Sequence, residues 1–587
     1  MGVYAKGEAF GTRDRGAGPR MTKNWSVGRG LTAAVPALGW LRGYGRADLP
    51  RDLSAGLVVG VMIVPQAMAY AVLAGLPPVY GLYASIVPTV AYALFGTSRH
   101  MPVGPPALMA LLTFSGVSAL AQPGTGDYIG LALLLALMAG VLQLGLGILR
   151  LGFVSNFIPL PVLSGFIYAS AVVISLSQAA ALLGIPAGEE RSTVGIISSL
   201  AGRIGQYNLP TLIIGVCSIA ALVCLARFFP RVPGALVVAA TTTAVVCALG
   251  LQGTGVGIVG EVPEGLPGLS LPPIGLETVR GLLPAALAVA LVGFVESVSV
   301  AKAVAARERY RLESNAELRG LGLANIAAAF TSGMPVAGSF SRTAVQDEAG
   351  ARTQLASVVT AGVVVLTLLF LTPLFYYLPD AALAAVILVA VFGLLDFRQA
   401  RRIFEVSPVD GAALVITFFV TLLVGVEEGI LAGALFALLA FLRRTAYPNV
   451  TQMGFVQEEG AFLDLERWPA AETDPGILIV RFDAALYYAN IPYLEEKLIE
   501  LVSEKPEVEW IVIDCRGINA IDVTAVEGLE ALVSGYRSRG VGILLTHVKL
   551  RVRERLAGAG WSEKFGDWTL RSTTRDAVAY ARSRAGA

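Results

Sequence analysis

The sequence has little charge, few cysteines and almost no histidine. Only 15% of its 587 residues are Asp, Glu, Lys or Arg and 55% are hydrophobic, whereas a typical soluble chain carries about 25% charge. This composition excludes a disordered chain and argues against an ordinary soluble enzyme. With 4 Cys, 2 His and no CxxC or HExxH spacing, neither a disulfide framework nor a metal site is expected. A net charge of +1 does not point to nucleic acid, and no cofactor is expected.

The missing charge is concentrated in long stretches. Asp, Glu, Lys and Arg are absent from residues 53–98, 100–126, 128–149, 151–188, 204–226, 232–260, 320–341, 353–379 and 411–426. A bilayer is crossed by roughly 20 apolar helical residues, and we count about fourteen hydrophobic segments up to Leu442. Charge returns after Arg444. We therefore predict a membrane domain over 49–445, preceded by a flexible basic cytoplasmic tail, 1–48, and followed by a cytoplasmic domain, 446–587.

The ends and the loops indicate how the chain sits in a membrane. No apolar stretch of signal-peptide type opens the chain, and either Met1 or Met21 is a possible start. If the N-terminus is inside, the inside loops hold most of the arginines: Arg99, Arg150, Arg227, Arg231, Arg307, Arg309, Arg311, Arg398, Arg401, Arg402, Arg443 and Arg444. The positive-inside rule then predicts a multi-pass protein of the inner or plasma membrane with both termini in the cytoplasm.

A short motif occurs once in each half of the membrane domain. Met101–Pro106 and Met334–Ser339 both place Pro and Gly directly before a helix-compatible stretch. Irregular backbone at membrane depth is tolerated only inside protein or beside a cavity, and matched interruptions in two halves point to a transport site. The starts of such half-helices favour an anion. The alternative is that both segments are ordinary loops.

Two charged residues fall inside otherwise apolar stretches. Arg342 follows the second motif, and Glu296 follows an uncharged stretch that begins at Gly281. A charge within a membrane is costly, so both are functional candidates. Arg342 can lie beside an anion, and Glu296 can carry a proton because burial favours a neutral carboxyl group. The alternative is an ion pair between them that braces two helices.

The first hydrophobic segment adds two polar candidates. Pro65 is expected to break this helix, and Gln66 and Tyr70, four residues apart, share a face. Their amide and phenol groups can line the cavity. The alternative is hydrogen bonding between helices.

Together these motifs resemble the sulfate permease (SulP) family. The likeness is carried by Val64–Gln66, Ala74–Tyr83, Phe95–His100, Val103–Pro105, Gly338–Val345 and Ala349–Gln354, and it extends over about residues 48–587. It implies fourteen transmembrane segments in two inverted repeats of seven, the architecture also used by uracil permeases. Segments 1–4 and 8–11 are expected to move against segments 5–7 and 12–14 as an elevator.

The resemblance also implies a substrate site. The family binds its anion between the starts of the third and tenth segments, which here correspond to Pro106 and Ala107 and to Ser339, Phe340, Ser341 and Arg342. Gln66 and Tyr70 line the site, and Glu296 is at the family's acidic position. Sodium-driven relatives carry a hydroxyl residue four positions after the acid, where this chain has Val300. That departure favours protons, although Ser297 and Ser299 keep sodium possible.

The C-terminal region alternates strand and helix patterns. Ile477–Phe482, Trp510–Asp514 and Val541–Leu545 are typical of strands, and Tyr493–Val502 and Val526–Tyr536 of helices. The region resembles the α/β STAS domain of anti-sigma-factor antagonists, with Thr524 at the position of their phosphorylated serine. The alternative is that Asp522 and Thr524 only cap a helix.

The sequence therefore predicts a non-enzymatic secondary active transporter. Its expected cargo is a small anion such as sulfate, bicarbonate or a C4-dicarboxylate, carried with a proton, and the resemblance implies a homodimer among membrane lipids. The alternatives are sodium-coupled or exchange transport, an anion channel or voltage-responsive motor, a nucleobase permease, and a sensor that signals through the C-terminal domain.

Overall fold

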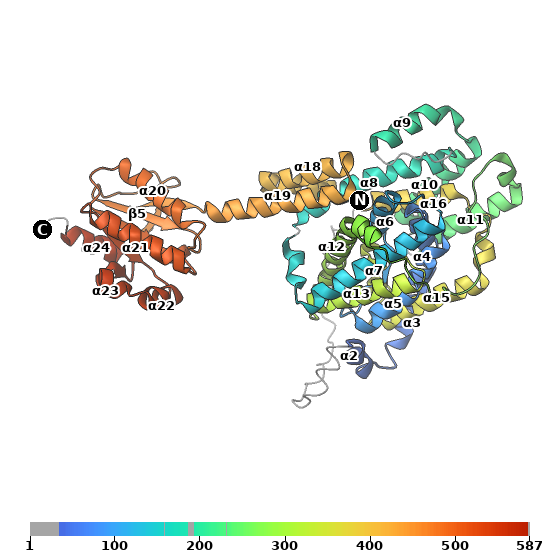
Figure 1. The fold of residues 1–587 in the computed structure, drawn as a ribbon, viewed down its shortest axis with the longest axis horizontal. Coiled ribbons are helices and arrows are strands. Elements are labelled where there is room, and N and C mark those ends of the chain that lie inside the picture. The colour runs from blue at the N-terminus through green and yellow to red at the C-terminus, as the bar shows by residue number, and fades with distance from the viewer. Residues whose placement is uncertain (1–34, 158, 186–192, 230–231, 585–587) are drawn as a thin grey trace. The chain divides into compact units, whose positions relative to one another are not determined.

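The chain forms two compact units, residues 1–434 and 435–587. The computed structural model describes residues 35–157, 159–185, 193–229 and 232–584 (Figure 1). The predicted tail over 1–48 lies mostly outside the described residues. Within it, α2 (Ala37–Arg42) is a short helix.

Helices make up nearly all of the first unit, as its apolar stretches predict. Its first half contains α3 (Leu49–Leu73), α4 (Val79–Tyr83), α5 (Val87–Phe95), α6 (Ala107–Ser118), α7 (Gly126–Ile148), α8 (Leu160–Leu183), α9 (Thr193–Arg203), α10 (Leu209–Phe228) and α11 (Gly234–Leu249). Its second half contains α12 (Leu276–Arg307), α13 (Ser314–Phe330), α14 (Phe340–Glu348), α15 (Leu355–Phe370), α16 (Asp380–Phe392), α17 (Phe397–Val406), α18 (Pro408–Leu423) and the start of α19 (Val426–Ala446), which continues into the second unit.

Several of these helices have the length and apolarity of membrane spans. Within the described ranges there are 6 such segments: Leu49–Leu73, Gly126–Ile148, Leu160–Leu183, Leu209–Phe228, Leu276–Arg307 and Asp380–Val406. The last comprises α16 and α17, and the helix is interrupted between Phe392 and Phe397. Shorter apolar helices include α6, α11, α15 and α18. The count of fourteen spans stays a prediction.

The expected break at Pro65 is wrong, because α3 runs from Leu49 to Leu73 with the proline inside it. A proline removes one backbone hydrogen bond, and a membrane helix survives this where neighbouring helices pack around it. Here α4 lies against α3 so closely that a Cβ on Gly81 would collide with the carbonyl of Ala67. Packing by the surrounding helices thus keeps α3 continuous through Pro65.

The helices of the first unit pack in two groups, which we call the core bundle and the flanking bundle. In the core bundle, α3 packs along α15, and α13 packs along α5 and α7. In the flanking bundle, α8 packs along α16 and α18, and α10 along α16. Small residues permit these contacts: Gly60 of α3 faces Val363, Gly140 of α7 faces Ile326, and Gly165 of α8 faces the Leu414 carbonyl.

The second unit is an α/β domain, as predicted. Its sheet has the strand order β4-β3-β5-β6-β7-β8. The strands are β3 (Val450–Val456), β4 (Ala461–Asp464), β5 (Ile477–Phe482), β6 (Trp510–Asp514), β7 (Gly542–Thr546) and β8 (Leu570–Arg571). The helices are α20 (Ile491–Ser503), α21 (Val523–Arg537), α22 (Leu550–Gly558), α23 (Trp561–Phe565) and α24 (Thr574–Arg584). β5 to β8 are parallel, and β3 is antiparallel to β4 and β5.

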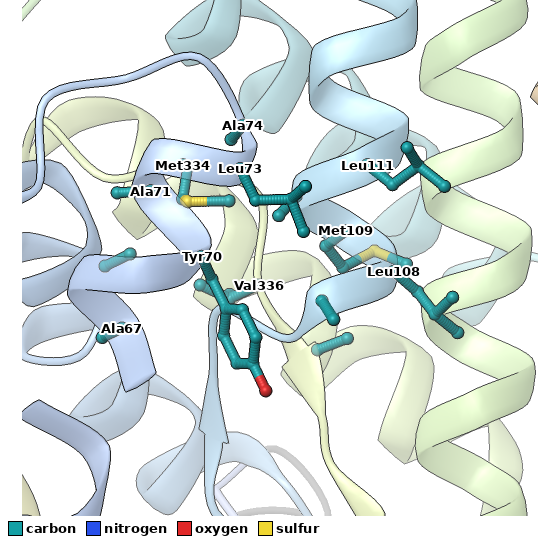
Figure 2. Close-up of a cluster of buried hydrophobic side chains, with 14 of the residues drawn as sticks. Ala67, Tyr70, Ala71, Leu73, Ala74, Leu108, Met109, Leu111, Met334 and Val336 are labelled. Atoms are coloured by element: carbon teal, nitrogen blue, oxygen red, sulfur yellow. The ribbon is translucent and has the colours of Figure 1, made fainter. Parts of the chain in front are cut away.

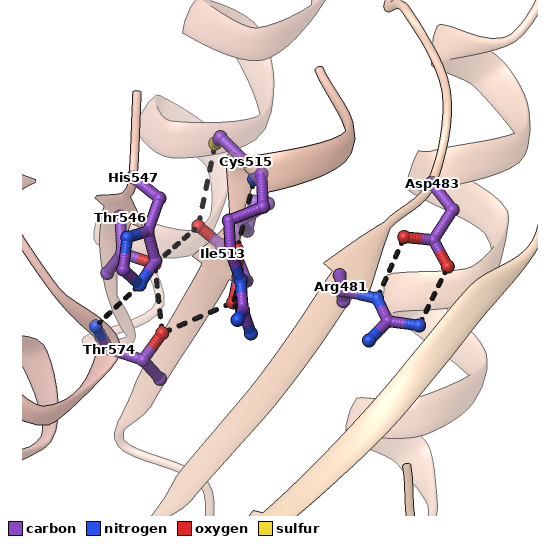
Figure 3. A network of polar contacts seen from close by, with 9 residues as sticks. Arg481, Asp483, Ile513, Cys515, Thr546, His547 and Thr574 are labelled. Atoms are coloured by element: carbon purple, nitrogen blue, oxygen red, sulfur yellow. Dashed lines mark hydrogen bonds and ion pairs between the residues drawn. The ribbon is translucent and has the colours of Figure 1, made fainter. Parts of the chain in front are cut away.

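Alternate residues of the parallel strands bury opposite faces of this sheet. Leu478 and Ile511 pack under α20 to α23, whereas Ile479 and Val512 pack against α24. A polar network closes the carboxyl edge, where buried Asp514 accepts from the Thr574 hydroxyl at 3.3 Å (Figure 3). Burial raises the pKa of the neighbouring Cys515 thiol to about 12, so this cysteine stays protonated and unreactive.

Candidate functional site

Two short strands from the two halves meet in the core bundle. β1 (Val103–Gly104) and β2 (Ala337–Gly338) are antiparallel, with Val103 opposite Gly338 and Gly104 opposite Ala337. All four residues are buried. The two predicted motifs are therefore extended, as expected, and in addition they pair with each other.

Each strand leads directly into a short helix. Pro106 and Ser339 are extended, and α6 and α14 begin at the next residue. The two helices have 12 and 9 residues, so they extend about 18 and 14 Å and are too short to cross a bilayer core. Neither first turn is capped by a side chain at these positions. Because the strands are antiparallel neighbours, both open helix starts lie beside the same strand pair and add their partial positive charges there.

Buried side chains from α5 and α13 fix the two extended segments. The Thr89 hydroxyl donates to the carbonyl of Val103 at 2.6 Å. Asn325 accepts from the Val336 N–H at 2.8 Å and donates to the Val336 carbonyl at 3.0 Å, as a neighbouring strand would. Asn325 also donates to Gln143 of α7 at 3.0 Å. The strand pair is thus held from both sides by helices of the core bundle.

Arg342 links the two halves from the first turn of α14. Its side chain is fully buried, with Nη1 donating to the carbonyl of Pro105 at 2.8 Å and Nη2 to that of Ala337 at 3.5 Å. Its Nε is buried without a hydrogen-bond partner among the described residues. A cation therefore lies between the two open helix starts, with one donor free.

Glu296 lies on α12, which packs against α6 and β2. The residue is buried, and its Oε2 has no hydrogen-bond partner within the described ranges. The next residue, Ser297, accepts from the Gly338 N–H at 2.8 Å and so ties α12 to β2. The predicted alternative of an ion pair between Glu296 and Arg342 is not what the structure shows: across the described ranges, no ion pair joins them within 4.0 Å. They do interact electrostatically.

Gln66 and Tyr70 both lie on α3. Tyr70 is buried and interacts electrostatically with Arg342 and Glu296, whereas Gln66 is half-buried. Figure 2 shows the Tyr70 ring pointing away from the apolar residues of α3 and α6, with its hydroxyl at the far end. Tyr70 therefore belongs to the same site as the two charged residues.

The remaining predicted site residues differ in their solvent exposure. Pro106 and Ala107 are buried at the start of α6, and Ser339 is half-buried. Phe340 and Ser341 are exposed, and the hydroxyls of Ser339 and Ser341 lie 3.2 Å apart. The start of α14 is thus the more accessible of the two. No group of three His, Cys, Asp or Glu able to hold a metal occurs in the described part of the chain.

Thr524 lies far from this site in the sequence, in the first turn of α21, and is exposed. Asp522 caps that helix by accepting from the Ala525 N–H at 2.8 Å. Of the two residues suggested as caps, only Asp522 is the cap, and the Thr524 side chain has no such role.

Sequence reasoning missed the residues that hold the site in place. The sequence motifs do not include Asn325 or Gln143, and they suggest Ser297 only as a ligand for sodium. Gln143 donates to the carbonyl of Ala290 at 3.1 Å, which joins α7 to α12. The signal was present, because Gln143 and Asn325 are polar residues within charge-free stretches.

Two family models match the chain. The sulfate permease family matches residues 49–417, and the STAS domain matches residues 469–577. Both matches agree with the resemblance noted in the sequence.

Sulfate transporters from several organisms are similar to this chain over most of its length. A probable sulfate transporter 4.2 of Arabidopsis thaliana is 38% identical over 568 residues, covering 93% of this chain and 83% of that protein. A probable sulfate transporter of Mycobacterium tuberculosis is 35% identical over 551 residues, covering 94% and 98%. The sodium-independent sulfate anion transporter of Bos taurus is 34% identical over 559 residues, covering 89% and 88%.

Solved structures share the fold. The overall structure of SLC26A9 matches with a TM-score of 0.87 at 24% identity, covering 98% of both chains. The transmembrane domain of the cyanobacterial bicarbonate transporter BicA matches with a TM-score of 0.59 at 22% identity, covering 67% of this chain and 98% of that one. The chain is therefore a multi-pass membrane transporter, not an enzyme, and it belongs to the sulfate permease family, with a STAS domain at its C-terminal end.

Proposed function

We propose that this chain is a secondary active transporter that carries a small dianion, sulfate in the first place, together with a proton. The observation that carries the proposal is the position of Arg342. This buried cation bridges the two open helix starts, and its Nε has no hydrogen-bond partner in the described part of the chain.

Anion binding follows from the charges around that position. Two helix starts and one guanidinium contribute positive charge, and the free donors of α6 and α14 match the acceptors of an oxyanion. The exposed hydroxyl of Ser341 and the buried phenol of Tyr70 add hydrogen-bond donors. Pro106, Ala107, Ser339 and Phe340 shape the entrance, and Gln66 lines it from α3. Sulfate is the first candidate for the transported anion, because the relatives from Arabidopsis, Mycobacterium and cattle are named sulfate transporters.

Proton coupling rests on Glu296. An ionised carboxylate without a partner is costly inside a membrane, whereas a protonated one can remain. A proton on Glu296 also lowers the local negative charge when a dianion binds beside Arg342. The cattle relative is named sodium-independent, which favours protons over sodium. Bicarbonate and C4-dicarboxylates remain alternative cargo, and sodium coupling, anion exchange and a channel remain alternative modes.

The elevator movement is proposed from the packing. The core bundle holds β1, β2, α6, α12 and α14 together, and the flanking bundle is a separate group formed by α8, α10, α16 and α18. A rigid core bundle that slides along the flanking bundle would carry the site across the membrane. We place the protein in the inner or plasma membrane as a homodimer, with both termini cytoplasmic. The exposed Thr524 hydroxyl is proposed as a phosphorylation site.

The test is uptake by the purified, full-length protein in liposomes. Labelled sulfate, bicarbonate, fumarate and uracil are supplied outside, and pH and sodium gradients are imposed separately. We expect concentrative sulfate uptake driven by an alkaline interior. Arg342→Ala should lower uptake about 10- to 100-fold, the value of one or two charge-assisted hydrogen bonds, and Arg342→Lys should lie between. Ser299→Ala serves as the control, since among the described residues its hydroxyl bonds only to the Val295 carbonyl, within α12.

The outcomes separate the alternatives. If Glu296→Gln keeps full acceleration by the pH gradient, proton coupling through this residue is wrong. Uptake that never exceeds the outside concentration indicates a channel, and uptake of uracil alone indicates a nucleobase permease. Unchanged sulfate affinity in Arg342→Ala, with an unchanged melting temperature, would exclude Arg342 from the anion site.

A further inference from the structure

A charged amphipathic helix interrupts the apolar second half of the membrane unit. α17 (Phe397–Val406) lies between α16 and α18 in the chain, and it has a charged face and an apolar face. Arg398, Arg401, Arg402 and Glu405 are spaced three or four residues apart and share one face. Phe397, Ala400 and Phe404 follow the same spacing on another face. Such a pattern is typical of a helix that lies in a membrane interface.

Hydrogen bonds define where α17 begins and where the next helix, α18, starts. Asp396 caps its start by accepting from the N–H groups of Arg398 and Gln399, both at 3.0 Å. The Tyr168 hydroxyl of α8 donates to the Asp396 carbonyl at 2.6 Å. After its end, Ser407 caps α18 by accepting from the Asp410 N–H at 3.3 Å. α17 is therefore a built element of the flanking bundle, not a loose connection.

Protein covers this helix only in part: the Phe397 ring stacks on Tyr168 of α8, and the Phe404 ring lies against Gly411 of α18. None of its residues is buried, and the apolar side chains Phe397, Phe404 and Val406 are 74%, 46% and 75% exposed. Exposed aromatic side chains in water would be unfavourable, but at the boundary between headgroups and acyl chains they are stabilised. In a multi-pass membrane protein, the bilayer is the medium that can cover them.

The arginines carry more positive charge than α17 itself neutralises. Glu405 pairs with Arg401 at 2.7 Å. Within the described ranges, Arg398 and Arg402 have no carboxylate within 4.0 Å. All three guanidinium groups belong to exposed residues. Two guanidinium groups without a carboxylate partner, next to exposed aromatic residues, can donate paired hydrogen bonds to phosphate groups at a membrane surface.

We propose that α17 lies in the membrane interface and binds the headgroups of anionic phospholipids through Arg398 and Arg402, with Arg401 in support. Phe397 and Phe404, which share the apolar face, enter the outer part of the acyl region. The occupant is an anionic lipid, because the charge and the apolar surface occur on one exposed helix, and a lipid supplies both complements. Each arginine near an anionic surface contributes about fivefold in affinity.

The experiment uses quenching by brominated lipids. The full-length Phe397→Trp protein is reconstituted in vesicles of phosphatidylcholine with increasing phosphatidylglycerol, one of the two being brominated. The fluorescence of the parent protein is subtracted, so the introduced indole alone is followed. We expect phosphatidylglycerol to be preferred over phosphatidylcholine by about 25-fold at this position, about fivefold for each of the two arginines. Arg398→Gln with Arg402→Gln should reduce the preference to about twofold or less.

A matched pair of substitutions provides the control. Arg551 and Arg553 are exposed arginines of α22 in the C-terminal unit, and replacing both with Gln should leave the preference unchanged. Inorganic phosphate, added at constant ionic strength, should not displace the lipid. If the double variant on α17 does not fold, Arg402→Gln alone should lower the preference about fivefold.

Three results would overturn the proposal. Equal quenching by both lipids would mean that the arginines do not select a headgroup. Quenching by neither lipid would mean that protein covers α17. Displacement of the lipid preference by inorganic phosphate would mean that the arginines form a site for a small anion.

Discussion

Two buried carboxylates of the core bundle have opposite surroundings. Glu317, in the first turn of α13, is fully buried. It accepts from the Tyr92 hydroxyl at 2.5 Å, from the N–H groups of Thr97 and Ser98 at 2.7 and 2.9 Å, and from the Thr97 hydroxyl. Glu296, in the middle of α12, has an Oε2 without any partner among the described residues.

The difference distinguishes a carboxylate that holds structure from one that is free to react. Donors around Glu317 stabilise its charge in one fixed arrangement, and removing it would leave several buried donors unpaired. At Glu296 the neighbouring contact is made by Ser297 instead, which ties α12 to Gly338. The sequence places Glu296 in an apolar stretch and Glu317 among charged residues, and only the packed structure shows that both are buried and that their partners differ.

The largest expected difference in stability is between the variants that lack one or the other of these carboxylates. Glu317→Ala should destabilise the protein by about 3 kcal/mol or more, because it leaves buried N–H and O–H groups without acceptors. Glu296→Ala removes a group whose Oε2 has no hydrogen-bond partner among the residues that the structure describes, so stability should hardly change. The melting temperature of each variant in detergent, followed by size-exclusion chromatography, measures the difference. Equal losses would mean that Glu296 is also a structural residue.

A second test uses two glycines near these acids. A Cβ on Gly320 of α13 would lie 2.8 Å from Cα and 2.9 Å from N of Gly96, so backbone must move. A Cβ on Gly293 of α12 would meet the flexible Met109 Sδ at 3.2 Å. Gly320→Ala should therefore cost about 1–3 kcal/mol, and Gly293→Ala less than about 1 kcal/mol.

The same melting experiment compares the two glycine variants. Liposome uptake provides a second measurement, in which Gly293→Ala should change the KM for sulfate. A large loss of stability in Gly293→Ala, equal to that of Gly320→Ala, would contradict the expectation that the Met109 side chain moves aside more easily than the Gly96 backbone.

The smallest expected effect distinguishes two serines of α12. Ser297→Ala removes the acceptor of the Gly338 N–H and leaves a buried donor unpaired. The cost is about 1–2 kcal/mol, and we expect the maximal uptake rate to fall by about tenfold. Ser299 is exposed, and its hydroxyl bonds only to the Val295 carbonyl within the described ranges. The maximal uptake rate of Ser299→Ala should therefore stay within about twofold of the parent rate. Similar rates for both variants would show that the contact to Gly338 does not support transport.

Much of the fold followed from the distribution of charge and of Pro and Gly. The charge-free stretches predicted the helices of the first unit, and Met101–Pro106 and Met334–Ser339 predicted extended segments before short helices. The strands Ile477–Phe482 and Trp510–Asp514 have the predicted bounds. These features depend on residues close together in the chain, which is why a single sequence reveals them.

Other features depend on contacts between distant segments and could not be predicted. The helix through Pro65 continues because α4 packs on it. Arg342 donates to backbone carbonyls and not to Glu296, a preference that only the placement of α12 decides. Asn325 substitutes for a strand partner at Val336, and no local pattern distinguishes it from a polar residue on a helix surface.

The pairing of β1 with β2 also has a consequence for biosynthesis. Arg342 and its acceptor Pro105 are 237 positions apart in the chain, and a ladder of two residue pairs has little stability alone. During translation, the first motif therefore emerges long before its partner exists. β1 can pair with β2, and Arg342 can reach the Pro105 carbonyl, only after both halves of the membrane unit have been synthesised. A chain that terminates before α14 would thus lack both the cation and the second helix start.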